Sequence, residues 1–419
     1  MRRIPLIVIA FYLQILSSFS QVTAPKDSSA YREEKLKVEE VNFVSGYYSQ
    51  NGDHSAVTGG IGTEQLTDIA NTIDLKLAKH KANGNKHTLS FELGVDTYTS
   101  ASSDNIQKPG QGTSVSSKGS RVSITGPSHQ DTRIYPSLSY LTENVKNGIT
   151  LGGGISYSHE FDYQSRGLNL SFIKSSKDNN REFGVKLFTY FDLWEAIYPW
   201  ELRPSADYSN GSRRNGGIPA TILPRNSYQA SFSLSQVINS RLQVALLFDP
   251  AYMKGQLTTL YQRVYFNDST VHVEKLPDTR LKLPVAIRMS YFLADRFVIR
   301  AYYRYYTDDW GNTAHTANIE VPVKITPFFS LSPFYRYSVQ TGIKYFAPIY
   351  GHSLNDSYYT SDYDLSPFHS QFIGCGIHIA PPKGIFGSKT WNSMEFRYGH
   401  YIRSTDLISD QLTLALKFK

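Results

Sequence analysis

Basic and aromatic side chains alternate along a stretch in the second half of the chain. Between Arg300 and Tyr306 they fall at every second position, and similar residues occur in the neighbouring stretches. A period of two places such residues on one side of an extended strand. Because guanidinium groups attract and bind anions, the pattern predicts a basic surface lining an anion pathway. The predicted set is Arg288, Arg300, Tyr302, Arg304, Tyr306, Glu320 and Arg336.

A second interpretation of these arginines remains open. They could pair with Glu320 and with acids elsewhere, so that they hold a wall or a folded-in loop in place. Anion preference is therefore a hypothesis from the sequence.

Acidic residues and histidines gather in four other stretches: Gly52 to His54, His159 to Asp162, Asp308 to Trp310, and Asp356 to Asp364. Such groups can bind calcium or activate water. Their spacing matches no calcium loop, zinc-protease helix, nucleophile elbow or phosphate-binding loop. The sequence therefore predicts no catalytic residue, metal site or cofactor. A hydrolase remains an alternative, with Asp308 and His315 as the residues to test.

Strand signals supply the elements that would position these residues. Alternation and turn residues predict sixteen strands at 41–49, 68–79, 87–97, 132–142, 148–158, 166–175, 181–193, 226–237, 241–252, 280–292, 296–306, 314–325, 328–339, 368–379, 392–402 and 408–418.

Most of the predicted strands have one apolar and one polar side. In the strand 87–97, Leu89, Phe91 and Leu93 alternate with residues such as Glu92. This is typical of a barrel with lipid outside and water inside. The same alternation predicts that Tyr303 faces lipid while Tyr302 faces the lumen.

The connections between the predicted strands alternate in length. Most of those after even-numbered strands are short, whereas 98–131, 194–225, 253–279 and 340–367 follow odd-numbered strands and are long. Periplasmic turns and external loops of outer-membrane barrels differ in this way. The Ser- and Gly-rich connection 98–131 and the connection 194–225 are the expected constriction or plug.

Bulk properties agree with this interpretation. The 419-residue chain is 14% aromatic, yet its mean hydropathy is -0.34. Residues 1–20 resemble a secretory signal peptide, 21–40 form a polar periplasmic lead-in, and 41–419 form the predicted barrel domain. The lone Cys375 excludes an intrachain disulfide, and the scattered charges, net +7, give no support to nucleic-acid binding.

The last strand is expected to close the barrel. Leu412, Leu414, Leu416 and Phe418 share one side of it. A barrel must leave no open edge in lipid, so this strand is predicted to pair with Val41 to Ser49.

Several stretches resemble the domain-of-unknown-function family three-five-seven-zero of Gram-negative bacteria. They are Val41 to Asp68, Asp96 to Ile106, Ser175 to Leu187, Arg263 to Asp268, Tyr303 to Pro322, Tyr358 to Ser366 and Arg397 to Thr405. The resemblance implies an outer-membrane β-barrel without assigned activity. Genes of this family can accompany those of flavin-transferase and thioredoxin-like proteins, which implies a link to periplasmic redox systems.

The sequence thus predicts an all-β protein, a transmembrane antiparallel up-and-down β-barrel of about 16 strands with both termini periplasmic. The expected function is a non-enzymatic, porin-like channel for small solutes with an anion preference. The alternatives are a binding or assembly barrel serving a periplasmic or redox-associated partner, and a barrel-rim hydrolase. The expected partners are outer-membrane lipid and lipopolysaccharide, the barrel assembly machinery, small solutes and periplasmic proteins, without nucleic acid.

Overall fold

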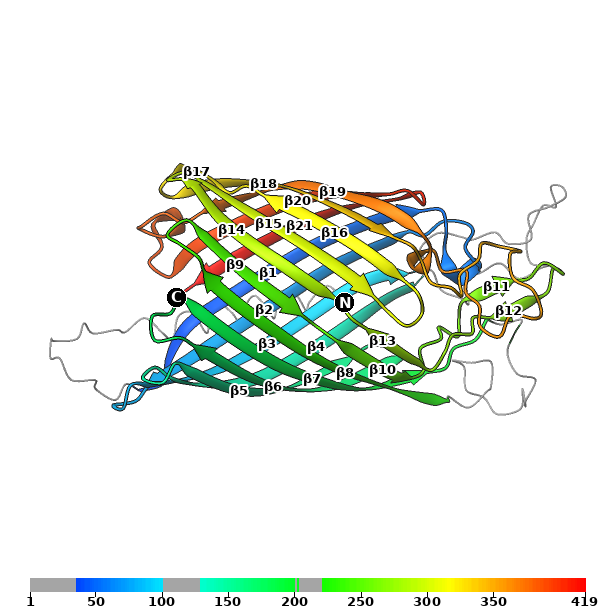
Figure 1. The fold of residues 1–419 in the computed structure, drawn as a ribbon, viewed down its shortest axis with the longest axis horizontal. Helices are drawn as coiled ribbons and strands as arrows, with labels where there is room; N and C mark the ends of the chain where they lie inside the picture. Colours follow the sequence, from blue (N-terminus) through cyan, green and yellow to red (C-terminus); the bar gives the residue numbers. More distant parts are fainter. Residues whose placement is uncertain (1–34, 101–128, 200–201, 203–220) are drawn as a thin grey trace.

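The computed structural model describes residues 35–100, 129–199, 202 and 221–419. Within these ranges the chain forms an antiparallel sheet that curves round and closes on itself (Figure 1). The predicted signal peptide, most of the predicted lead-in and most of the two predicted plug connections, 98–131 and 194–225, lie outside the described residues.

Sixteen strands make up the barrel wall, as the sequence predicts. The first eight are β1 (Lys37–Gly52), β2 (Leu66–His80), β3 (Asn85–Ser100), β4 (His129–Asn144), β5 (Ile149–His159), β6 (Tyr163–Ser175), β7 (Arg181–Glu195) and β8 (Ile222–Val237). Three of the next five are each split in two: β9 (Leu242–Phe248) with β10 (Ala251–Gly255), β13 (Thr279–Lys282) with β14 (Val285–Ala294), β15 (Phe297–Thr307), β16 (Thr313–Glu320) with β17 (Val323–Thr326), and β18 (Phe329–Gln340). The wall ends with β19 (Phe368–Ile379), β20 (Trp391–Arg403) and β21 (Leu407–Phe418).

The splits differ from the predicted unbroken strands and have a common cause. Pro250, Pro284 and Pro322 occupy the three interruptions, and proline has no N–H to give to the ladder. The proline carbonyls still accept hydrogen bonds from neighbouring strands. Asp249 N donates to Pro284 O at 3.1 Å, and Ala230 N donates to Pro250 O at 3.0 Å. The wall therefore continues across each break.

The last strand closes the barrel, as predicted. β21 runs antiparallel to β1, with Phe418 opposite Val41 and Leu407 opposite Gly52. β1 begins at Lys37, earlier than the predicted start at Val41, because Lys37 and Val38 also pair with β2 around a bulge.

The two ends of the barrel carry different connections. The short-turn end contains 81–84, 145–148, 176–180, 238–241, 295–296, 327–328 and 380–390, the last with the 3-10 turn η4 (Ile385–Gly387). The loop end contains 53–65, 160–162, 256–278, 308–312, 341–367 and 404–406, and it includes η1 (Ala56–Thr58), η3 (Tyr363–Leu365) and the hairpin of β11 (Arg263–Tyr265) and β12 (Val271–Val273). Figure 1 shows this hairpin beyond the wall, at the end opposite to the C-terminus. The small β11–β12 sheet has no counterpart in the prediction.

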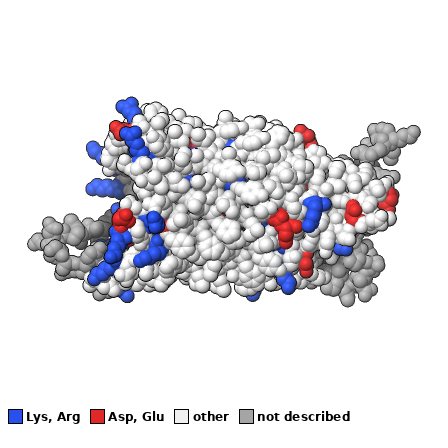
Figure 2. Space-filling view, viewed as in Figure 1, with Lys and Arg blue, Asp and Glu red and all other residues white. Residues whose placement is uncertain are grey.

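Large apolar side chains cover the outside of the barrel. Leu168 and Leu170 on β6 are 54% and 63% exposed, and Tyr303 and Tyr305 on β15 are also exposed. Figure 2 shows few charges on the middle of one face, with Lys and Arg gathered at the short-turn end. This distribution fits a wall surrounded by hydrocarbon.

No helix in the described ranges is both long enough and apolar enough to cross a membrane.

Replacing Leu414 with arginine should destabilise the closed barrel. Leu414 lies opposite Ser45 and Phe396 on the outer face of the closing strand, where a charge in lipid costs about 2–4 kcal/mol near the midplane. We expect reduced heat-modifiable migration in gels and a lower urea midpoint.

Ala415→Arg is the matched control, since its side chain enters the lumen beside Glu395. Equal assembly and equal unfolding of the two variants would contradict the closing role of Leu414.

Candidate functional site

The seven residues predicted to line the lumen share one face of the sheet. The exposed Tyr303, Tyr305 and Tyr335 alternate with them along β15 and β18 and point outward. Arg288 lies directly opposite Tyr302 in the register, and Arg300 lies opposite Glu320. Residues paired across strands point to the same side, so the set faces the interior. Its role in transport stays a prediction.

Two members of the set, Arg300 and Glu320, pair with each other. Arg300 Nη1 lies 3.4 Å from Glu320 Oε1, as the second interpretation expects. Arg397 on β20 also reaches Glu320, with Nη2 3.3 Å from Oε2, and Nη1 lies 3.1 Å from Glu395 Oε1. The alternation of β20 places Arg397 on the polar face, but the sequence does not show its contact with β16, a strand that β20 does not adjoin.

Three arginines of the set have no carboxylate partner among the described residues: Arg288, Arg304 and Arg336. All three are exposed on the inner face. Arg304 follows Tyr302 by two positions and Tyr302 is opposite Arg288, so two like charges lie diagonally adjacent on neighbouring strands. An arrangement of this kind lowers its electrostatic energy when an anion is present.

The inner wall at the loop end is different, because its arginines are neutralised. Each pairs with a carboxylate across neighbouring strands or with a loop carboxylate: Arg133 with Asp96, Arg225 with Asp192, Arg280 with Asp308, and Arg403 with Asp364.

Arg280 shows how such a pair is held. Its Nη2 and Nε donate to Asp308 Oδ2 at 2.6 and 3.0 Å, and its guanidinium stands 4.3 Å from the Trp310 ring centroid. Tyr306 and the backbone of Asn312 donate to the same carboxylate. Tyr306, which was predicted to line the lumen, therefore helps to hold the Arg280–Asp308 pair. The pairs at the loop end were not predicted, because partners on different strands become visible only once the register is known.

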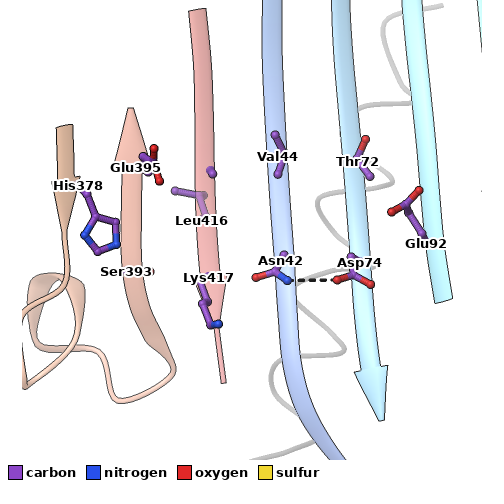
Figure 3. Close-up of a pocket in the computed structure, with 11 residues that line it drawn as sticks. Asn42, Val44, Thr72, Asp74, Glu92, His378, Ser393, Glu395, Leu416 and Lys417 are labelled. Atoms are coloured by element: carbon purple, nitrogen blue, oxygen red, sulfur yellow. Dashed lines mark hydrogen bonds between the residues drawn. The ribbon is translucent and has the colours of Figure 1, made fainter. Parts of the chain in front are cut away.

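A cavity of about 440 Å³ opens on the inner wall around the closing seam (Figure 3). Figure 3 shows Glu92 and Glu395 on its two sides, with His378 beyond Glu395. Asn42 Nδ2 donates to Asp74 Oδ2 at 3.2 Å across β1 and β2. Lys76 also pairs with Asp74, at 3.2 Å, so this side of the lumen is polar and largely ion-paired.

Loops at the loop end pack into a folded cap, formed by 53–65, 256–278, 308–312 and 341–367. Val264 and Phe266 of the β11–β12 hairpin are 0% and 2% exposed. Arg263 Nη1 donates to Val57 O at 2.8 Å, which joins the hairpin to η1. A Cβ on Gly59 would lie 2.5 Å from the Tyr265 ring, so only glycine allows this contact.

Three carboxyls of the cap have raised pKa values. Burial, followed by repulsion from Asp362, raises the pKa of Glu274 to about 8. Burial and Asp364 raise the pKa of Asp362 to about 6 and that of Glu64 to about 7. Glu274 accepts hydrogen bonds from Thr360 Oγ1 at 2.6 Å and from the backbone N–H of Thr259 at 2.7 Å.

The rim residues considered for hydrolysis do not form one site. Asp308 points inward and is bound to Arg280, whereas His315 is exposed on the outer face, with its Nδ1 2.7 Å from Tyr303 Oη. His54 lies flat on Tyr363, with ring centroids 3.9 Å apart. Among the described residues, no three His, Cys, Asp or Glu side chains are grouped to hold a metal ion.

Removing the Asp308 carboxylate should strongly destabilise the barrel. The side chains of Arg280 and Asp308 are 12% and 0% exposed, and losing one partner of a buried pair costs about 3–5 kcal/mol. We expect Asp308→Ala to lower the urea midpoint clearly, while Asp295→Ala in an exposed short turn should leave it nearly unchanged. Matching midpoints would show that the pair contributes little.

The cap should loosen as the pH rises. A carboxyl with a raised pKa keeps its proton in the folded cap after the unfolded chain has lost it. The resulting stability is complete below the ordinary carboxyl pKa of about 4 and is lost as the pH rises to about 8, the pKa of Glu274.

Hydrogen exchange of 256–278 and 341–367, corrected for intrinsic rates, should therefore be faster at pH 8.5 than at pH 5. Glu274→Gln, which stays neutral, should reduce this difference. Protection that increases with pH would refute the assignment.

Comparisons with known proteins identify a family for the chain but assign it no activity. No curated protein matches the chain. Solved structures with a similar backbone trace include a bacterial polysaccharide outer membrane secretin (TM-score 0.42, 10% identity, covering 91% of this chain and 98% of that chain). Another is OccK1 from Pseudomonas aeruginosa (TM-score 0.40, 6% identity, covering 90% of this chain and 97% of that chain). A third is a BenF-like porin from Pseudomonas fluorescens Pf-5 (TM-score 0.40, 8% identity, covering 90% of this chain and 98% of that chain). The family described as "Protein of unknown function (DUF3570)" matches residues 13–398, and the chain therefore belongs to this family.

Proposed function

We propose that the protein is a porin-like channel of the outer membrane that admits small solutes and favours anions. The observation that carries the proposal is the contrast among the inward-facing arginines. Those at the loop end are paired with carboxylates, whereas Arg288, Arg304 and Arg336 face the lumen without one in the described part of the chain. Unpaired positive charge on a pore wall raises the local concentration of anions.

The dimensions and surface of the barrel support this function. Sixteen strands enclose an interior wide enough for an aqueous channel. The outer face is apolar, as insertion in lipid requires. Short turns are typical of the periplasmic end, which supports a periplasmic location for the start of β1 and the end of β21; residues 1–20 would be removed as a signal peptide. Lipopolysaccharide would then surround the loop end, and the assembly machinery would act on β21.

A planar-bilayer recording under a salt gradient tests the proposal. The wild-type channel should give a reversal potential on the anion-preferring side. Arg288→Gln combined with Arg304→Gln should move this potential toward zero, because two of the three lumen-facing arginines without a carboxylate partner among the described residues are lost.

Arg166→Gln is the control, since Arg166 lies opposite Tyr157 on the outer face and is exposed there. It should leave the reversal potential unchanged. A cation-preferring wild-type channel would refute the anion preference, and the absence of conductance would refute the channel.

A further inference from the structure

One of the three unpaired arginines is held in a fixed orientation. The guanidinium of Arg336 lies over the Phe372 ring, 5.4 Å from its centroid. Phe372 is directly opposite Arg336 on β19, so the contact joins neighbouring strands on the inner wall. Stacking on an aromatic face restrains the plane of a guanidinium and leaves its N–H edge free for a ligand.

Glycine on the next strand allows this ring to lie where it does. Gly399 on β20 lies beside the ring, and a Cβ there would be 2.3 Å from Phe372 Cζ and 2.5 Å from Cε2. Any other residue at 399 would force the ring to move. The orientation of Arg336 therefore depends on Phe372, and that of Phe372 on Gly399.

The neighbouring stack provides an internal comparison. Phe334 contacts Phe372, with centroids 5.2 Å apart, and Arg397 lies over Phe334 at 5.0 Å. Arg397 is neutralised by Glu320 and Glu395. At the other end of the same aromatic pair, Arg336 has no carboxylate among the described residues. Of these two stacked guanidinium groups, that of Arg397 is therefore already bound to carboxylates, whereas that of Arg336 can bind a solute.

We propose that Arg336 is a carboxylate-binding station on the lumen wall, with Phe372 and Gly399 as its positioning residues; this rests on the proposed channel function. The planar fork of arginine matches a planar carboxylate through two parallel hydrogen bonds. A guanidinium that is already oriented loses less conformational entropy on binding. The station therefore selects small carboxylates over anions of equal charge with a pyramidal head group.

The test compares propionate with ethanesulfonate, which have equal charge and similar size. Competition with chloride current through the full-length protein in planar bilayers gives an apparent affinity for each. Ligand-detected NMR on the refolded protein in detergent gives the same comparison without conductance. The wild type should prefer propionate.

Arg336→Lys separates charge from geometry. It keeps the positive charge, so the general anion preference should persist. The preference for propionate should fall roughly three- to tenfold, as expected for the loss of one net charge-assisted hydrogen bond. Phe372→Leu should produce a similar fall, and Phe372→Tyr, which keeps the ring, should restore the preference.

Arg304→Lys is the matched control, because Arg304 also faces the lumen without a carboxylate partner in the described part of the chain but has no aromatic ring beneath it there. It should leave the preference for propionate unchanged. If Arg336→Lys and Phe372→Leu discriminate as the wild type does, or if Arg304→Lys loses discrimination equally, the station is refuted while the channel stands. Discrimination in NMR without any conductance would refute the channel and retain the station.

Discussion

The structure depends on the hydrogen bonding between its first and last strands. Hydrocarbon offers no partner to a backbone N–H or C=O, so an open edge in the membrane would leave a row of them unsatisfied. The pairing of β1 with β21, from Val41 opposite Phe418 to Gly52 opposite Leu407, removes that edge. Closure divides each strand into an outer and an inner side. The alternation of side chains, the separation of charge from lipid and the existence of a lumen follow from it.

Within the lumen, the position of a charge determines how it is used. The buried Asp308 requires Arg280, because an isolated carboxylate shielded from water is costly. Arg288 and Arg304 lie on the exposed inner wall, where water and mobile ions screen their repulsion. The same residue type is therefore structural where the cap and the wall exclude water, and available to solutes where they do not.

Strand order, closure and inward-facing positions could be predicted because they depend on local alternation. The outward placement of Tyr303 and the inward placement of Tyr302 follow from a period of two alone. The breaks at Pro250, Pro284 and Pro322 were missed because alternation continues across them.

Contacts between distant parts of the chain could not be predicted from alternation. Arg397 meets Glu320 through a geometry that no local pattern records. The packing of the Phe372 ring against Gly399 likewise depends on the register between β19 and β20. The β11–β12 hairpin lies within the single loop 256–278, but its burial depends on the three other loops of the cap, and its short strands carry too few residues for a periodic signal.

The hydrogen bond from Arg263 to Val57 spans 206 positions of sequence. Its two residues belong to loops that follow the first strand and the β9–β10 pair of the wall, and contacts between such distant segments form late because loop closure is entropically costly. The cap can therefore assemble fully only when the cylinder has brought these loops together. A folded cap therefore indicates that the barrel has closed. Resistance of the β11–β12 hairpin to protease added to the refolded protein would therefore distinguish closed barrels from incompletely assembled ones.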